Sequence, residues 1–359
     1  MAKLKKQHMT IHWKAIVQDD SSIPATEATL KEKATLVGRI GLMMLSVGTG
    51  AWRVRNSMNK VSRCLGITCT ADIGLLAISY TCIEGTDTYT QSISLPTTGV
   101  NTHKLMELEL FMKEFPDKVS TCSVKHIHEV LDEIQKFPAN YKAWNLGLAS
   151  ALACGAFTFL LGGGPVEMCC AFLGAGVGNF VRKKMLGHSI SLLANVAVSV
   201  AVSCLVYVLT ILLAQSLLSV SAVHQAGYIC AMLFVIPGFP LITGGIDLAK
   251  LDLRSGLERV SYALLIILTA TMTGWATAAI CQFQPADFEP LQLQKWTLLC
   301  FRLITSFCGV YGFSLIFNSP RKMAFTAALI GMFTNTLRLE LVDLAHMPIG
   351  AAAFIGAFC

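Results

Sequence analysis

The stretch that decides the fold is residues 236–265, which read IPGFPLITGGIDLAKLDLRSGLERVSYALL. It begins inside an apolar run that opens near His224. The run is long enough to cross a bilayer, for which a helix needs about 20 apolar residues. Pro237 and Pro240 each remove a backbone hydrogen-bond donor and clash with the preceding turn. With Gly238 between them, they predict a helix that breaks or kinks inside this run.

A broken helix within a membrane indicates a binding site for a polar solute. Freed carbonyl groups are tolerated in hydrocarbon only where protein or a water-filled cavity satisfies them. Many secondary transporters bind their solute at such a break, where the helix ends present partial charges to ammonium and carboxylate groups. The substrate-binding residues predicted on this basis are Pro237, Gly238, Pro240, Thr243, Gly244 and Gly245.

Two charged residues in the apolar runs are further candidates. An ionisable residue in a membrane segment is a functional candidate by default, and we predict that Asp247 couples transport to protons. The alternative is that Asp247 caps the mixed-charge connector that carries Lys250 and Arg254. Arg302 could contact a substrate carboxylate, or its long side chain could extend to the outer interface.

The composition divides the chain into two parts. Hydrophobic residues make up 54% of the 359 residues and charged residues only 14%, whereas a soluble domain carries about a quarter charged residues. Charges are concentrated in residues 1–142 and scarce afterwards. We therefore expect a soluble front part and a membrane-embedded back part. The net charge of +6 fits basic cytoplasmic loops better than nucleic-acid binding.

Several kinds of chemistry find no support in the sequence. The 13 cysteines form no C-x-x-C pair, and many lie in apolar runs, where a free cysteine behaves as a small hydrophobe. They predict neither a disulfide framework nor a metal site. No phosphate-binding G-x-x-x-x-G-K-[ST] motif and no nucleophile–base–acid constellation occur. The sequence therefore predicts no enzyme, no cofactor and no ATP-driven pump.

The front part is predicted to be a small cytosolic α+β domain, residues 29–142, behind a flexible tail, residues 1–28. The tail has lysines but no long apolar core, so we do not expect a signal peptide. Residues 67–96 are rich in β-branched and aromatic residues, and the turn-forming residues 84–87 lie between two such runs. This pattern predicts a β-hairpin.

Helices are expected on both sides of the hairpin. Residues 29–64 have helical periodicity, interrupted at Gly48-Thr49-Gly50. The interruption indicates either close approach of a ligand or of the membrane domain to a bare backbone, or packing of two helices at small residues.

Two more helices are predicted over residues 102–115 and 123–137, the first ending at Pro116. His126 and His128 lie two positions apart on the second helix and so do not share a face. We therefore expect both to be surface residues rather than ligands.

The back part is predicted to form a first membrane domain of five helices, residues 143–283, and a partial second one, residues 294–359. The candidate spans are 144–161, 165–181, 190–213, 224–248, 257–281, 296–317 and 323–341, with an eighth beginning near Met347. Glycines are dense within the spans, and small residues allow close packing of membrane helices. The fold class is thus a polytopic α-helical membrane protein of about seven or eight transmembrane helices with an N-terminal cytosolic α+β domain.

The basic residues set the predicted orientation. The second, fourth and sixth spans end at Arg182-Lys183-Lys184, at Lys250 and Arg254, and at Arg321-Lys322. The opposite loops carry little positive charge, and one of them contains Asp287. By the positive-inside rule, the front domain and these basic sites lie on the cytoplasmic side of the inner membrane.

The residues quoted above resemble a known family. P-G-x-P-L-I-x-G-x-x-D-L at 237–248 with S-G-L-x-R at 255–259 resembles the signature of the bacterial threonine/serine exporters. Residues 38–66 resemble the family's amino-terminal helix and its small-residue turn. The likeness extends over residues 33–359. It implies multi-pass export of small hydroxylated amino acids by antiport with protons.

The resemblance is incomplete at the carboxy-terminal end. The family continues through more spans and carries a second motif rich in proline and glycine, which does not occur here. We therefore expect a truncated form, or a separate polypeptide that supplies the remaining spans. Two alternative functions stay open. One is export of a dicarboxylate such as succinate with a partner subunit, and the other is a non-transporting membrane scaffold. A homo-oligomer is also compatible with the sequence.

Overall fold

The computed structural model describes residues 11, 13, 23–186, 188, 190–218, 227–283, 288 and 291–359. The described residues divide into two compact units, one drawn from the ranges 1–139 and 237–264, the other from 140–236 and 265–359. Most of the expected tail lies outside the described residues, as do His224 and Asp287.

The first unit begins with two helices joined at the expected interruption. Helix α2 (Leu30–Ser46) starts with a capping box, in which the side chain of Thr29 accepts from the backbone of Glu32 and the side chain of Glu32 accepts from the backbone of Thr29. Helix α3 (Ala51–Cys64) follows. Gly48 has a φ of +90°, which an L-residue rarely adopts, and this turn separates the two helices. A short 3-10 helix, η2 (Ala25–Glu27), precedes α2.

A three-stranded antiparallel sheet follows, in the order β1-β2-β3. Its strands are β1 (Thr68–Ile73), β2 (Ala77–Glu84) and β3 (Asp87–Ser94). Glu84 pairs with Asp87 across a tight turn whose Gly85 has a φ of +59°, which confirms the predicted hairpin. The first of the two runs expected in residues 67–96 forms two strands, β1 and β2. The chain turns between them at Gly74, whose N–H donates to the carbonyl of Ala77.

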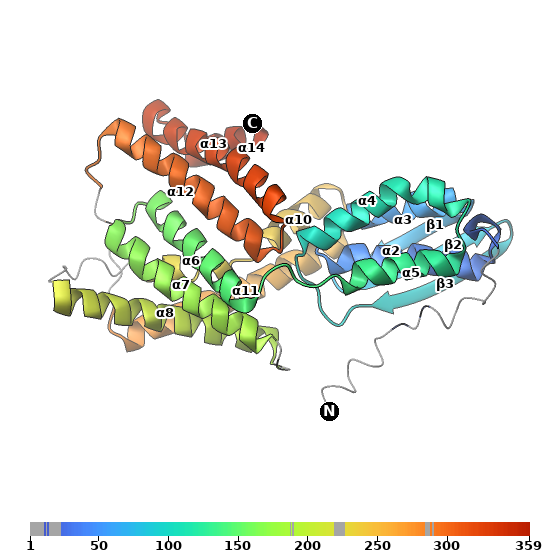
Figure 1. Cartoon of the computed structure of the whole chain (residues 1–359), viewed down its shortest axis with the longest axis horizontal. Helices are drawn as coiled ribbons and strands as arrows, with labels where there is room; N and C mark the ends of the chain where they lie inside the picture. Colours follow the sequence, from blue (N-terminus) through green and yellow to red (C-terminus); the bar gives the residue numbers. More distant parts are fainter. Residues whose placement is uncertain are drawn as a thin grey trace. The chain divides into compact units, whose positions relative to one another are not determined.

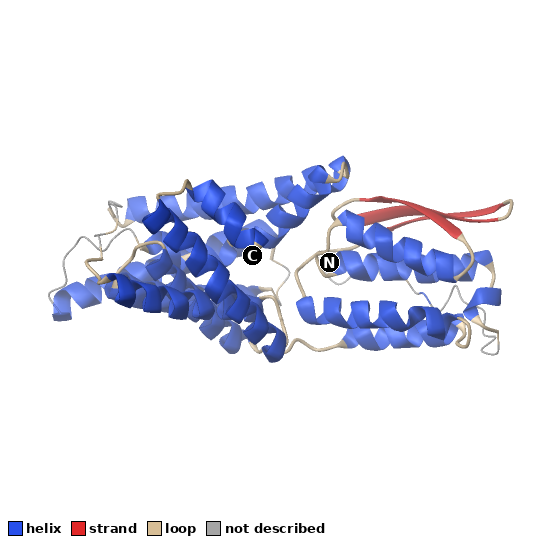
Figure 2. Ribbon diagram, turned by 90° about the horizontal axis from the view of Figure 1, so that it is seen from above, coloured by secondary structure: helices blue, strands red, loops and turns tan. Residues whose placement is uncertain are grey.

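The sheet, α2 and α3, and a second helix pair form three layers. Helices α2 and α3 pack on one face of the sheet, while α4 (Thr102–Val119) and α5 (Val124–Lys136) lie on the far side of α2 and α3 (Figure 2). The core between the layers includes Leu36, Ile40, Met44, Ile78 and Leu131.

Two predictions in this unit were wrong. Helix α4 does not end at Pro116 but continues to Val119. A proline at this position deprives the Met112 carbonyl of its helical partner, but the ammonium of Lys60 donates to that carbonyl at 2.5 Å instead. His128 is not a surface residue: it is 0% exposed and hydrogen-bonds within the core.

The second unit is a helical bundle (Figure 1). Its helices are α6 (Ala143–Leu160), α7 (Pro165–Met185), α8 (Leu192–Leu218), α9 (Tyr228–Ala231), the 3-10 helix η4 (Leu233–Val235), α12 (Lys295–Ile316), α13 (Arg321–Ala345) and α14 (Ile349–Phe358). Neighbours pack in the order α8, α7, α6, α12, α13, α14. Helix α10 (Gly238–Ala249) belongs to the first unit, and the long helix α11 (Leu253–Ile280) begins there.

Four helices of the described residues are long and apolar enough to cross a membrane, namely α6, α8, α11 and α12. The broken segment Tyr228–Val235 plus Gly238–Ala249 makes a fifth if the pair forms one span. The chain is thus a helical membrane protein with an N-terminal α+β region and four or five candidate spans.

Glycines in the second unit permit close helix packing, as the sequence predicts. A Cβ atom at Gly174 of α7 would lie 2.7 Å from the Ser203 carbonyl oxygen of α8. One at Gly147 of α6 would lie 2.9 Å from the Gly176 carbonyl oxygen of α7. Larger residues would push these helices apart.

Candidate functional site

The candidate site is built on the hairpin of α10 and α11 in the first unit. Helix α10 begins at Gly238 with Pro237 as its N-cap, and the preceding η4 ends at Val235. The helix therefore breaks at Pro237, as predicted. Pro240 does not break it, because Pro240 lies in the first turn of α10, where a backbone N–H has no intrahelical acceptor to lose.

The two glycines of the G-G pair have different surroundings. A Cβ atom at Gly244 would lie 3.1 Å from the Cβ of Arg259, so Gly244 brings α10 close to α11. A Cβ atom at Gly245 or Gly238 would meet nothing within 4 Å. The hydroxyl of Thr243 donates to the Phe239 carbonyl of its own helix at 3.0 Å. Gly238 and Gly245 thus leave backbone open, while Gly244 serves packing.

Asp247 is the centre of a buried polar cluster, and it is 0% exposed. Its Oδ2 accepts from the backbone N–H of Ala51 at 3.0 Å and from the hydroxyl of Ser255 at 3.0 Å. The same oxygen lies 3.2 Å from Nε of Arg259. Ala51 is the first residue of α3, where helix N–H groups and the helix dipole attract negative charge. Among the described residues, Oδ1 has no hydrogen-bond partner.

Arg259 completes the cluster and links it to the turn between α2 and α3. Its side chain is 2% exposed, its Nε also donates to the Ser255 hydroxyl at 3.1 Å, and its Nη2 donates to the Thr49 carbonyl at 2.6 Å. A Cβ atom at Gly50 would lie 2.8 Å from Asp247 Oδ1. The bare backbone of the Gly48–Gly50 turn is therefore approached by a carboxylate from α10.

Further contacts fix the hairpin to the rest of the unit. Arg55 of α3 pairs with Asp252 of the connector at 2.6 Å, and this hydrogen-bonded ion pair raises the pKa of the Arg55 guanidinium. A carboxylate oxygen of Glu258 accepts from the backbone N–H of Leu75, next to the sheet, at 2.6 Å. The cluster is thus held by contacts with α3 and with the β1–β2 turn.

The connector residues proposed as partners of Asp247 have other contacts. The ammonium of Lys250 lies 4.7 Å from the ring centre of Trp52, a cation–π geometry. Arg254 forms its ion pairs with Asp72 of β1 and with Glu258. The charge that faces Asp247 is that of Arg259.

Arg302 lies in the second unit and is not part of this cluster. It pairs with Glu340 of α13 at 2.7 Å and with Asp343 of the same helix. The Arg302 guanidinium, which the sequence analysis considered as a contact for a substrate carboxylate, thus already pairs with two carboxylates of the chain.

Sequence reasoning missed Ser255 and Arg259 as partners of Asp247. The signal was present in S-G-L-x-R, which places the two polar residues one helical turn apart on the same face of α11. No cluster of three or more metal-ligating side chains occurs among the described residues.

A broken apolar segment rich in proline and glycine, a buried ion pair beside it and a set of membrane spans define a membrane transporter. The chain belongs to the family described as "Putative threonine/serine exporter", whose sequence profile matches residues 35–281.

Two curated relatives support this assignment, and both are named "Probable succinate transporter subunit YjjP". The protein from Klebsiella aerogenes is 25% identical over 65% of this chain and 87% of its own length. The protein from Escherichia coli is 24% identical over 65% of this chain and 88% of its own length. No solved structure matches the chain significantly.

Proposed function

We propose that the chain is a subunit of a secondary exporter that moves small carboxylate-bearing solutes out of the cell in exchange for protons. The observation that carries the proposal is the buried Asp247–Arg259 pair, which adjoins open backbone on the Pro/Gly-rich helix α10. Membership of a transporter family supports transport as the class of activity. Threonine and serine are the first candidate substrates, as the family's description indicates.

The pair suggests how protons and solute can be coupled. A proton on Asp247 would bind at Oδ1, the oxygen without a partner among the described residues. Neutralising the carboxylate weakens its attraction to Arg259 and to the N-terminus of α3. The guanidinium of Arg259 would then be available to a substrate carboxylate, which it can bind with two hydrogen bonds. Asp247 thus acts as the proton-coupling residue. Arg259 binds the carboxylate of Asp247 in one state and the carboxylate of the substrate in the other.

The solute would bind along the first turns of α10. The residues in this proposed site are Pro237, Gly238, Pro240, Thr243, Gly244 and Gly245. Gly238 and Gly245 leave room for a solute beside the main chain, and the oxygen of Thr243 can still accept a hydrogen bond. Arg302 remains a proposed carboxylate contact in the second unit, in competition with its two acidic partners.

The proposed topology has seven or eight spans and a cytoplasmic N-terminal region. Helices α7 and α13 would add two spans to the four or five candidates, and the short α14 would begin another. The domain boundaries predicted above, 29–142, 143–283 and 294–359, belong to this proposal. A cysteine at Lys183 should resist a membrane-impermeant reagent added from outside, whereas one at Asp287 should react. The reverse pattern would reject the orientation.

Succinate or a related dicarboxylate is the second candidate substrate, and the names of the two relatives favour it. Both are called transporter subunits, so we propose that this chain also works with a membrane partner that supplies further spans. The remaining alternative is a scaffold that transports nothing.

Transport into inverted membrane vesicles distinguishes these functions. Labelled threonine, serine and succinate are offered with and without a proton gradient, to vesicles with this chain alone or with a co-expressed partner. Uptake driven by the gradient supports the exporter and identifies its substrate. In transporting vesicles, Asp247→Asn should abolish gradient-driven uptake and leave part of the solute exchange. Normal uptake with unchanged pH dependence would remove Asp247 from the coupling role, and no uptake of any solute would favour the scaffold.

A further inference from the structure

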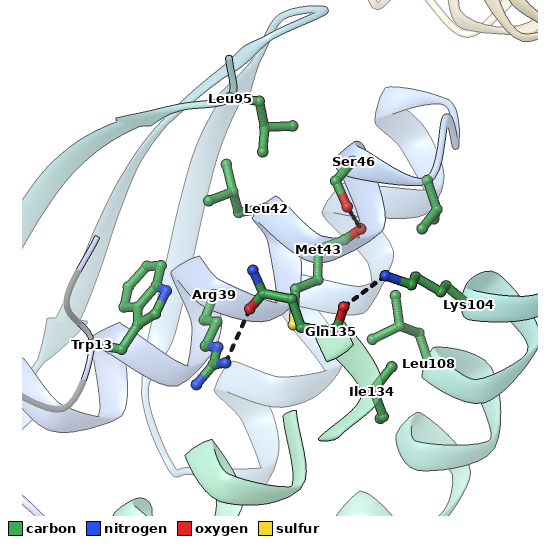
Figure 3. A pocket seen from close by; sticks show the side chains of 11 residues that line it. Trp13, Arg39, Leu42, Met43, Ser46, Leu95, Lys104, Leu108, Ile134 and Gln135 are labelled. Carbon is green, nitrogen blue, oxygen red and sulfur yellow. Dashed lines mark hydrogen bonds between the residues drawn. The ribbon is translucent and has the colours of Figure 1, made fainter. Parts of the chain in front are cut away.

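A cavity of 90 Å³ lies inside the N-terminal α+β region, away from the Asp247 cluster. Figure 3 shows its lining, in which Arg39 and Ser46 come from α2, Lys104 and Leu108 from α4, and Ile134 and Gln135 from the end of α5. Leu42 and Met43 add apolar wall. Among the described residues, the lining contains two cationic side chains and no acidic one. The transport proposal assigns no role to this cavity.

Arginine is rarely found in a protein interior, yet the side chain of Arg39 is only 2% exposed. Its Nη1 donates to the carbonyl oxygen of His128 at 2.9 Å and lies 3.0 Å from His128 Nδ1. Its Nη2 contacts Asp132 and donates to the side-chain oxygen of Gln135 at 3.2 Å. The Nε–H is buried and has no hydrogen-bond partner among the described residues. A buried donor in this state costs stability unless a ligand or water accepts from it.

His128 holds the guanidinium in a fixed direction. Because arginine cannot accept a hydrogen bond, Nδ1 of His128 must be the acceptor, so the imidazole is neutral and its proton is on Nε2. That Nε2 lies 3.0 Å from the hydroxyl of Thr35, which in turn donates to the Glu32 carbonyl at 2.6 Å. The arginine is thus positioned by a chain of hydrogen bonds and not only by an acidic neighbour.

Lys104 supplies a second positive charge. Its ammonium donates to the backbone carbonyl of Gln135 at 2.6 Å, and no carboxylate of the described residues pairs with it. Burial lowers the pKa of this ammonium. In Figure 3, Gln135 lies between the two cations, with its side chain turned to Arg39 and its carbonyl turned to Lys104. An ammonium with three donors has capacity left for an anion.

We propose that this cavity binds a small organic carboxylate between Lys104 and the Nε–H of Arg39. Its volume is that of about three water molecules at ~30 Å³ each, and a cavity of ~150 Å³ accepts benzene, so a ligand of roughly four to five non-hydrogen atoms fits. Acetate and propionate have this size. The carboxylate would meet the two cations, and a methyl or ethyl group would pack on Leu42, Met43 and Leu108.

The location suggests what the ligand would do. Ser46 and Val47 line the cavity, and the next three residues are the Gly48–Gly50 turn. That turn supplies the Thr49 carbonyl to Arg259 and the close approach to Asp247. A ligand that holds the end of α2 would therefore stabilise the turn that accommodates the buried ion pair. On this reasoning the cavity is an effector site for small acids. The bound acid can be a separate metabolite or the carboxylate end of the transported solute.

Ligand-observed NMR titration of ¹³C-acetate and ¹³C-propionate tests the site, with the full chain in lipid nanodiscs. Lys104→Met should weaken binding at least about 10-fold, because it removes a charge-assisted hydrogen bond. Lys113→Met is the matched control, since Lys113 is an exposed lysine on the same helix and should change nothing. Ser46→Leu fills the cavity without removing a charge and should abolish binding.

Saturable binding with this pattern supports the site. Competition by threonine or succinate would identify the transported solute as the source of the carboxylate, and its absence would indicate a separate metabolite. Equal displacement by chloride or phosphate would overturn the carboxylate assignment. Absence of saturable binding, or binding retained in both Lys104→Met and Ser46→Leu, would overturn the cavity itself. Because the readout is binding, it does not depend on whether the chain transports.

Discussion

Removing the partners of the buried ion pair singly and together is the most direct test of the Asp247 cluster. Asp247→Asn keeps the shape of the side chain and removes its charge. Arg259→Met keeps a long apolar stem and removes the guanidinium. The double variant leaves no charge at the site. The three variants separate the energy of the pair from the energy of the individual hydrogen bonds.

The expected magnitude follows from burial. The two side chains are 0% and 2% exposed, so water cannot compensate the charge that a single substitution leaves behind. Breaking such a pair destabilises by about 3–5 kcal/mol, whereas replacing both partners by neutral groups can be nearly neutral. The double variant still loses the bond to the Thr49 carbonyl, whereas the amide oxygen of the new asparagine can still accept from the Ala51 N–H. Such a bond contributes about 1 kcal/mol. The loss in the double variant should therefore fall well below the sum of the two single losses.

Thermal unfolding of the detergent-solubilised chain is the assay, followed by intrinsic fluorescence and by the folded fraction on size exclusion. Each single variant should melt on the order of 10 °C lower, since 1 kcal/mol corresponds to about 2–4 °C for a chain region of this size. Arg254→Met is the control, because Arg254 on the same helix forms an exposed pair with Asp72, worth about 0–1 kcal/mol. Single variants that melt within about 2 °C of the unmodified chain, or a double variant that loses the full sum, would refute the buried pair.

Two further predictions concern backbone contacts. Gly50→Ala should destabilise by about 1–3 kcal/mol, because the new methyl group would lie 2.8 Å from the buried carboxylate oxygen. Gly245→Ala should instead stabilise by about 0.5–1 kcal/mol, since its helix position is open; equal melting shifts for the two variants would contradict the geometry. Lys60→Met should destabilise by about 1–2 kcal/mol, because the Met112 carbonyl loses its donor. Pro116→Ala gives the Met112 carbonyl a backbone N–H donor at position 116. Denaturant titration should therefore show that Pro116→Ala raises the free energy of unfolding more in the Lys60→Met variant than in the unmodified chain.

The local features of the fold could be predicted because short-range chemistry determines them. Pro237 lacks a backbone donor and clashes with the preceding turn, so the break at this residue is visible in the sequence alone. Gly85 with its neighbours defines a hairpin turn for the same reason. Pro116 shows the limit of this reasoning, because its effect on α4 is offset by Lys60, a residue from another helix.

The candidate site could be predicted only in part. Asp247 stands out as a charge beside an apolar break, but its partner Ala51 lies 196 residues earlier in the chain. The Thr49 carbonyl that binds Arg259 lies 210 residues before that arginine. No periodicity connects such positions. His128 was misjudged for a related reason: a rule about shared helix faces tests for a metal site and says nothing about burial. Its partners, Thr35 and Arg39, lie on α2 and not on its own helix.

The turn between α2 and α3 contacts the buried ion pair and follows directly on the cavity wall. The end of one helix leaves C=O groups without helical partners, and the start of the next leaves N–H groups without them. Here the Thr49 carbonyl binds the arginine of the pair, and the Ala51 N–H binds the carboxylate. The same turn follows directly on the cavity wall formed by Ser46 and Val47. Because both ions of the pair bind this turn, we expect that a ligand that fixes the end of α2 would also affect the ion pair.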